Sequence, residues 1–220
     1  AVELDPGFAR AHAGLSFVQF EDAFLRFADE PAAAQTEARA WAERSLELDP
    51  LDPFCNLVMG RVHWLNADLE ASLPWLERAI RLNPNYAQAK YSLAWTETLL
   101  GDPASGRADA DEALKLSPLD PLAYGMLGVR ALSHLIGDEP AAAAQWAARA
   151  ARAPGAHALI EMIAAVAHAL NGDCARADAA FASSLRRNPD LSAAEFLRAF
   201  PVRDPAARER IAAALRTLQG

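Results

Sequence analysis

Residues 48–84 contain the repeating unit of this chain in its clearest form, LDPLDPFCNLVMGRVHWLNADLEASLPWLERAIRLNP. The unit lies between the phrases Leu-Asp-Pro and Leu-Asn-Pro, and related phrases recur along the chain. They end at Pro6, Pro50, Pro84, Pro118, Pro154 and Pro189. The spacings between these prolines are 44, 34, 34, 36 and 35 residues, a period that predicts a repeated helix-turn-helix unit.

Small side chains stand at two fixed offsets from these prolines. Ten residues after each proline stand Ser16, Gly60, Ala94, Gly128 and Ala164, and twelve before the next stand Ala38, Ser72, Gly106, Ala142 and Ala177. Small side chains allow two helix backbones to approach closely where they cross. The pattern therefore predicts antiparallel helix hairpins.

The expected turns within the hairpins contain glycine and aspartate. They are Gly101-Asp102-Pro103, Gly137-Asp138-Glu139-Pro140 and Gly172-Asp173. Each glycine is expected to adopt the left-handed conformation that ends a helix, and each aspartate is expected to cap the next helix.

Composition favours an all-α chain that is folded. Alanine accounts for 52 of the 220 residues, and Val and Ile are few, which favours helices over sheets. A hydrophobic content of 52% is too high for a disordered chain, and no apolar run is long enough to cross a bilayer, so no membrane partner is expected.

Charge is distributed unevenly along the chain. Residues 1–148 carry a formal charge of −11, whereas residues 149–220 carry +3. The acidic body disfavours nucleic acid as a partner, because it repels phosphate backbones. We interpret the basic C-terminal third as a solvated helix face, with a patch for a phosphate or an acidic partner as the alternative.

Cysteine and histidine give no sign of a metal site or an active site. Cys55 and Cys174 belong to no paired motif, and two free thiols suit a reducing compartment, so the expected location is cytoplasmic. His157 and Glu161 stand four residues apart, but two ligands are too few for a metal, and a hydrogen bond at the helix start is the expected role of His157. No phosphate loop or nucleophile motif is present, so we expect no cofactor and no enzyme within these residues.

The register of Gly60, Ser72, Ala79 and Pro84 is similar to that of tetratricopeptide repeats, and the resemblance extends over essentially the whole chain. The large side chain of the family pattern is matched by Leu76, Trp146 and Phe181. The chain departs from the pattern at Asn56 and Lys90, where an aromatic residue is usual, and at Arg149, where a small one is.

The resemblance implies an all-α, right-handed superhelix (α-solenoid) of about five helix hairpins plus a C-terminal capping helix. Residues 1–220 would form a single array of repeats. Its parts are a remnant of a preceding repeat (1–6), a repeat with a ten-residue insertion (7–50), four repeats (51–84, 85–118, 119–154 and 155–189), and a partial repeat with the cap (190–220). A chain that opens without methionine at the end of a hairpin also leads us to expect an upstream repeat or domain.

By the same resemblance, the first helix of each hairpin lines a concave groove. The residues expected to face this groove are Leu57, Arg61, Trp64, Gln88, Tyr91, Trp95, Val129 and Leu132. Such a surface suits a peptide or helix with apolar anchors and one carboxylate. The alternative is that Trp64 and Trp95 fill the core between repeats. The lysine and asparagine clamp of repeats that bind chaperone carboxyl tails is not evident.

The ten-residue insertion falls around Phe17 to Pro31. Phe17, Phe20, Phe24 and Phe27 are spaced by three, four and three residues, which places them on one stripe of an extended helix. This stripe is either packed in the core or exposed as a docking ridge for a partner helix.

Three phrases resemble the C-terminal repeat region of bacterial multidomain signalling proteins: FARAHAGL at 8–15, MGRVHW at 59–64 and FPVRDP at 200–205. In those proteins a class III adenylate or guanylate cyclase domain, or a winged-helix DNA-binding domain, precedes the repeats. The resemblance implies a non-catalytic module that binds a protein or peptide or positions the output domain. The alternative is a scaffold that self-associates into a homo-oligomer through the phenylalanine ridge or the C-terminal helix.

Overall fold

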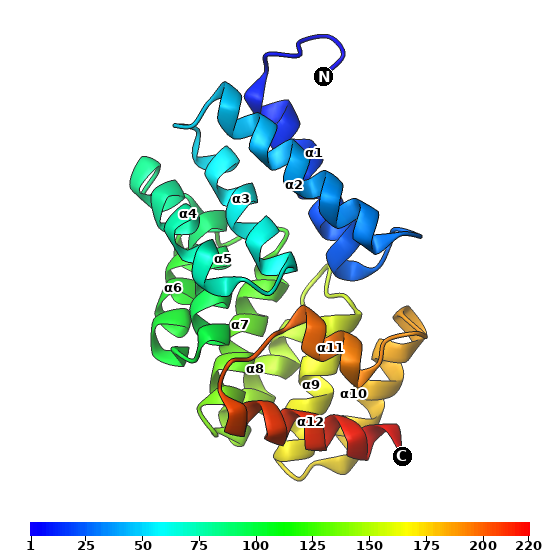
Figure 1. Ribbon diagram of the computed structural model, residues 1–220. Coiled ribbons are helices and arrows are strands. Elements are labelled where there is room, and N and C mark those ends of the chain that lie inside the picture. The colour runs from blue at the N-terminus through cyan, green and yellow to red at the C-terminus, as the bar shows by residue number, and fades with distance from the viewer. The chain divides into compact units, whose positions relative to one another are not determined.

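The computed structural model describes all 220 residues, and they form twelve α-helices and no strand (Figure 1). The helices are α1 (Ala9–Leu25), α2 (Pro31–Leu48), α3 (Pro53–Leu65), α4 (Leu69–Leu82), α5 (Ala87–Leu100), α6 (Pro103–Leu116), α7 (Ala123–Ile136), α8 (Pro140–Arg152), α9 (Ala158–Leu170), α10 (Cys174–Arg187), α11 (Ala193–Ala199) and α12 (Pro205–Gln219). The prediction of an all-α chain of the solenoid type is confirmed. The chain divides into two compact units, 1–96 and 97–220.

Proline and aspartate fix where many of these helices begin. Proline is the first residue of α2, α3, α6, α8 and α12, a position where its missing N–H leaves no hydrogen bond unmade. The side chains of Asp52, Asp68, Asp102, Asp173 and Asp204 accept hydrogen bonds from amides in the first turns that follow them. The local sequence therefore determines the residue at which each of these helices begins.

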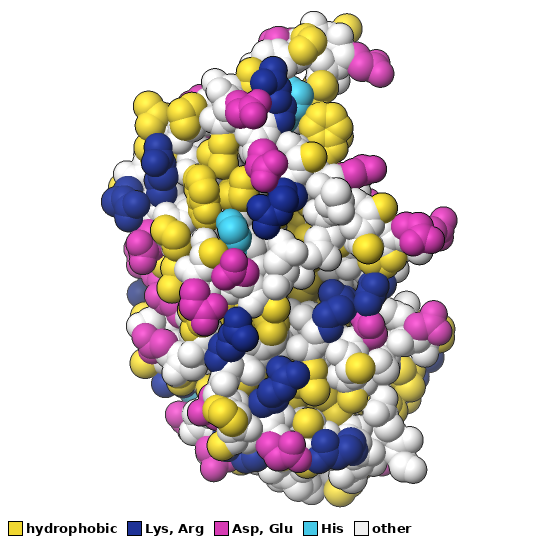
Figure 2. Space-filling view, in the orientation of Figure 1, with side chains coloured by type: hydrophobic (Ala, Val, Ile, Leu, Met, Phe, Trp, Pro, Cys, Tyr) yellow, Lys and Arg dark blue, Asp and Glu magenta, His cyan; other side chains and the backbone are white.

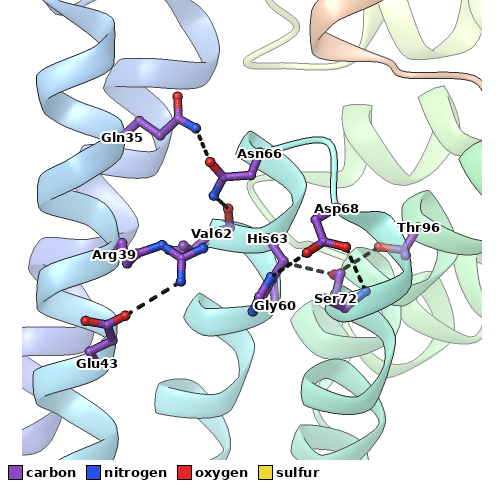
Figure 3. Close-up of polar contacts among 11 residues, drawn as sticks. Gln35, Arg39, Glu43, Gly60, Val62, His63, Asn66, Asp68, Ser72 and Thr96 are labelled. Carbon is purple, nitrogen blue, oxygen red and sulfur yellow. Dashed lines mark hydrogen bonds and ion pairs between the residues drawn. The ribbon is translucent and has the colours of Figure 1, made fainter.

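The predicted close approach of paired helices is confirmed in the first two hairpins. The Ser72 hydroxyl of α4 donates to the Gly60 carbonyl of α3 at 2.8 Å (Figure 3), and a Cβ atom at Gly60 would lie 2.7 Å from the Leu76 side chain. In the preceding hairpin the roles are exchanged, because the Ser16 hydroxyl of α1 donates to the Ala38 carbonyl of α2, also at 2.8 Å. A larger side chain at Gly60 would displace the Leu76 side chain or force the two helices apart.

The turn prediction is confirmed for two of the three turns. Gly101 and Gly172 have φ values of 98° and 78°, in the left-handed region, and the aspartate after each caps the next helix. It is wrong for the turn after α7. There Gly137 has a φ of −74°, and Glu139 precedes α8 without a capping hydrogen bond from its side chain.

The turn after α7 differs because its glycine does not stand at the position that takes the left-handed conformation. The turns at 66–68, 137–139 and 171–173 each place their middle residue in the left-handed region. That residue is Ala67, Asp138 or Gly172. Gly137 therefore stands one residue before the position where a glycine would relieve backbone strain.

The extra ten residues of the first hairpin are shared between its two helices and its turn. Helices α1 and α2 have 17 and 18 residues, whereas α3 and α4 have 13 and 14. The turn at 26–30 is also two residues longer than the turn at 66–68. Each helix is thus about one turn longer than its counterpart, so the insertion is not confined to the stretch from Phe17 to Pro31.

Helix α1 is shorter than the phenylalanine spacing suggests. Arg26 adopts a left-handed conformation with φ 61°, which ends the helix at Leu25. Phe27 therefore lies in the turn, 71% exposed, and the prediction that all four phenylalanines share one helix is wrong for this residue. Before α1, the Leu4 and Asp5 amides donate to the Ala1 carbonyl in a turn. The interpretation of residues 1–6 as a repeat remnant stays a prediction.

In the C-terminal unit, α12 packs against α7 and α9 as well as against α10 and α11 (Figure 1). The Arg203 amide donates to the Leu99 carbonyl at 2.8 Å, and the Arg210 guanidinium donates to the Leu135 and Ile136 carbonyls at 3.3 and 3.2 Å. The apolar side chains of this segment, Phe196, Phe200, Ile211 and Leu215, are fully buried. The segment predicted to cap the end of the array therefore also covers two earlier helices.

Candidate protein-binding site

Arg61 joins three helices at the centre of the N-terminal unit. Its side chain projects from α3 and is 4% exposed. The guanidinium donates through Nε to Ser92 at 3.1 Å, through Nη1 to Glu21 at 3.4 Å and through Nη2 to Gln88 at 3.2 Å. Since Glu21 lies on α1 and the other two partners lie on α5, Arg61 holds the first helices of three hairpins together.

Aromatic rings surround this arginine. The guanidinium carbon lies 4.7 Å from the ring centre of Phe17, 5.4 Å from that of Phe20 and 5.8 Å from that of Tyr91. A second layer of rings continues from them, because Phe20 stacks on Phe24 and Trp64 contacts Phe20, Phe24 and Trp95. We call this group the Arg61 cluster: Phe17, Phe20, Glu21, Phe24, Arg61, Trp64, Gln88, Tyr91 and Trp95. Contacts of a guanidinium with ring faces stabilise it by about 0.5–2 kcal/mol each.

The cluster contains eight of the twelve residues singled out in the sequence, but most of them are not on the surface. Phe20, Phe24, Arg61, Trp64 and Trp95 are buried, and so is Leu57 nearby. In this structure neighbouring side chains cover these residues, so the expectation of an open groove lined by Leu57, Arg61, Trp64 and Trp95 is wrong. The two tryptophans lie in the core, as in the alternative interpretation.

A half-buried rim remains above the buried part of the cluster. It consists of Phe17 and Glu21 on α1 and of Gln88 and Tyr91 on α5. Sequence reasoning missed Glu21, although its position four residues after Phe17 places it on the same helix face. The rim therefore offers two rings, an amide and a carboxylate around one arginine.

Glu21 is a poor internal partner for Arg61. Burial raises the pKa of this carboxyl, the Arg61 charge lowers it in part, and Asp22 raises it further. The distance of 3.4 Å between the guanidinium and the carboxylate is long, since charge-assisted hydrogen bonds are usually about 2.7–2.9 Å. The contact between Arg61 and Glu21 is therefore weaker than a well-formed ion pair.

The two groove candidates of the C-terminal unit are also buried. Val129 and Leu132 lie in α7 and are fully buried. Helix α12 packs against the same helix. The expectation that Val129 and Leu132 face an open groove is wrong.

The pair of His157 and Glu161 does not form a metal site. Glu161 accepts a hydrogen bond from Arg187 at 3.0 Å, and His157 makes an edge-on contact with the Tyr124 ring at 5.3 Å. The His157 side chain makes no capping hydrogen bond, so the role predicted for it at the helix start is wrong. Burial and the Arg187 charge lower the pKa of His157 to about 4. No group of three or more His, Cys, Asp or Glu side chains is placed to hold a metal ion.

The remaining features are the cysteines, the surface charge and the length of the helices. Both cysteines are free, and burial raises the pKa of the Cys55 thiol to about 11. Acidic and basic side chains are interspersed on the face shown in Figure 2. None of the twelve helices combines the length and the apolar character that crossing a membrane requires.

Comparisons with known proteins identify the repeat. Residues 55–86 match the sequence model of the tetratricopeptide repeat, whereas no curated protein sequence matches the chain. Among solved structures, PilW, a widely conserved type IV pilus biogenesis factor, is similar at 18% identity and a TM-score of 0.64, over 93% of this chain and 98% of that chain. A thermophilic tetratricopeptide repeat protein from Thermus thermophilus is similar at 19% identity and 0.63, over 89% and 99% of the two chains. Pseudomonas aeruginosa PilF is similar at 12% identity and 0.61, over 93% and 90%.

Proposed function

We propose that this chain, whose fold is that of tetratricopeptide repeat proteins and whose residues 55–86 match the repeat itself, is a non-catalytic module that binds a protein partner. The bound segment is a peptide or helix that sits on the rim of the Arg61 cluster. Stacked helix hairpins suit this role, because they present extended surfaces built from successive first helices.

The observation that carries the proposal is a buried arginine whose carboxylate partner, Glu21 on the half-buried rim, lies 3.4 Å away. A carboxylate of the partner replaces Glu21 at the Arg61 guanidinium and gains a shorter, charge-assisted contact. The rings of Phe17 and Tyr91 then receive apolar side chains of the same segment.

A displayed library of random peptides, selected on the whole chain, tests this proposal. The selected peptides are expected to carry at least one acidic residue beside apolar ones. Their dissociation constants, measured by fluorescence anisotropy, should rise about tenfold in the variant Gln88→Ala/Tyr91→Ala and fall in Glu21→Gln, which removes the internal competitor. Arg81→Ala, an exposed change on α4, is the matched control.

Unchanged binding in both variants would contradict the proposal. Equal effects of the control variant and of Gln88→Ala/Tyr91→Ala would contradict it too, because the site would then lie elsewhere. Neither variant alters Arg61 itself, whose removal would leave Glu21 without its cation and disturb the fold.

The wider context follows from the sequence phrases at 8–15, 59–64 and 200–205. In this proposal the module belongs to a cytoplasmic bacterial signalling protein and positions a nucleotide cyclase or winged-helix output domain. The gene sequence that precedes the codon for Ala1 tests it. An upstream sequence that encodes neither kind of domain would contradict this context, while leaving the binding proposal untouched.

Self-association is a second candidate function, and exposed apolar side chains around α1 favour it. Phe8, Val18 and Phe27 are exposed, so these apolar side chains are available for contact with a second copy of the chain. Light scattering at increasing concentration should then report a dimer or larger species that Phe27→Ser dissociates. A chain that stays monomeric at high concentration would exclude this candidate.

A further inference from the structure

A hollow lies in the C-terminal unit, on other helices than those that carry the Arg61 cluster. It has a volume of about 950 Å³, with α8 and α10 as its walls and α9 as its floor. Its lining is rich in alanine: Ala141, Ala144, Ala148, Ala151, Ala164, Ala179 and Ala180. The groove is wide because these side chains end at Cβ. Small side chains of this kind allow another helix to pack closely against α8 and α10.

Two buried polar side chains on the floor of this groove have unsatisfied atoms. Glu161 is 6% exposed and His168 is 7% exposed, and both line the groove. Glu161 Oε2 and His168 Nδ1 have no hydrogen-bond partner. Since buried polar atoms are nearly always paired, these two atoms point to a ligand that supplies hydrogen bonds at the floor.

The rim of the groove carries unneutralised positive charge at one end. Arg152 ends α8, and Arg186 lies in the last turn of α10; both are exposed and neither forms an ion pair. Glu161, the one acidic residue of the lining, is already paired with Arg187 at 3.0 Å. Two arginines of the basic C-terminal third thus lie at the same end of the groove, where α8 and α10 end.

We propose that the groove between α8 and α10 binds an acidic α-helix of a partner protein. Small or aliphatic side chains of that helix rest on the alanine walls, and its carboxylates pair with Arg152 and Arg186. A hydroxyl or amide group on its buried face donates to Glu161 Oε2. This surface belongs to the C-terminal unit and to other helices than the Arg61 cluster, so it is a separate site.

The experiment uses the whole chain and a displayed library of helical peptides as long as α10, which has 14 residues. Peptides whose binding falls in the Gln88→Ala/Tyr91→Ala variant are assigned to the Arg61 cluster and set aside, so the two proposals fail independently. The remaining peptides are expected to be acidic. Their affinity should fall about tenfold or more in Arg152→Glu/Arg186→Glu, and also as the salt concentration rises.

Two further variants make the test specific. Lys115→Glu/Arg208→Glu produces the same change in net charge at two exposed residues outside the groove, and it should leave the affinity unchanged. Ala148→Phe fills the groove without a change of charge and should weaken binding by about tenfold or more. Circular dichroism checks that all three variants remain folded.

Three results would overturn the proposal. They are a selection that yields no peptide assigned to the groove, a set of peptides without acidic bias, and equal losses of affinity in the two charge-reversal variants. A dimer in light scattering that Arg152→Glu/Arg186→Glu dissociates would also overturn it, because the occupant would then be a second copy of this chain.

Discussion

Replacement of Gly60 by alanine tests whether close helix approach, rather than helix propensity, determines the small residues of the repeat. A Cβ atom at this position would lie 2.7 Å from two carbon atoms of Leu76, which is itself fully buried. The Ser72 carbonyl oxygen, also on α4, would lie 3.5 Å from the same Cβ atom. The α3–α4 hairpin would therefore have to open, or Leu76 would have to leave its packing position.

Gly14 provides a matched control, because it also lies inside a first helix but a Cβ atom there would meet nothing within 4 Å. Alanine is favoured over glycine in a helix by about 1 kcal/mol, so Gly14→Ala should stabilise the chain by that amount. At Gly60 the same gain is opposed by overpacking, which costs about 1–3 kcal/mol. Since the propensity gain is common to both variants, their difference in unfolding free energy isolates the packing cost, about 1–3 kcal/mol.

Urea denaturation followed by circular dichroism measures both changes, and the slope of each transition shows whether unfolding remains comparable. In a Leu76→Ala background the clash is absent, so Gly60→Ala should there become neutral or stabilising. The reasoning would be refuted if Gly60→Ala stabilised the wild-type chain as much as Gly14→Ala does.

Three other predictions concern a turn, a carboxyl and the thiols. Ala67→Gly should raise the unfolding free energy by about 1 kcal/mol, because the φ of 54° at this residue is strained for alanine and not for glycine. Ala213→Gly, inside α12, should lower the unfolding free energy by a similar amount. Urea denaturation measures both changes. Burial raises the pKa of Glu21 in the folded state, so ionisation of this carboxyl destabilises the wild-type fold as the pH rises above about 4.3. The variant Glu21→Gln has no such charge. Its unfolding free energy relative to the wild type should therefore be higher at neutral pH than in acid. An equal advantage at both pH values would contradict this cause. Iodoacetamide should label the exposed Cys174 in the folded chain and leave Cys55 unmodified, because Cys55 is buried and its pKa is raised to about 11; mass spectrometry of peptides distinguishes the two.

The helices and their pairing could be read from the sequence because the signals are local. The recurring prolines and the small residues at fixed offsets depend only on distance along the chain, and the contact of Ser72 with Gly60 realises that pattern (Figure 3). The turn after α7 shows the limit of this reasoning. A one-residue shift of register moved the left-handed position from Gly137 to Asp138, and composition alone does not reveal such a shift.

Exposure was much harder to predict than position. Arg61 and Trp64 were expected to face an open groove, yet the fold buries them because the rings of α1 pack over α3. Glu21 was missed because its place on the same helix face as Phe17 reveals no role until its neighbours from other helices are known. The groove between α8 and α10 was missed for a similar reason, because runs of alanine first indicate helix propensity and only the assembled walls reveal a hollow.

Because α12 packs against earlier helices, the C-terminal unit is expected to unfold differently from a simple array of repeats. In an array where each repeat contacts only its neighbours, unfolding can begin at either end and proceed one repeat at a time. Here Arg210 bonds to the carbonyls of Leu135 and Ile136, 75 and 74 residues earlier in the chain. The last helix thereby ties a middle repeat to the final one, so fraying from the carboxyl end is opposed by contacts that release only together. Residues 97–220 should accordingly behave in hydrogen exchange as one cooperative unit rather than as a series of independent hairpins.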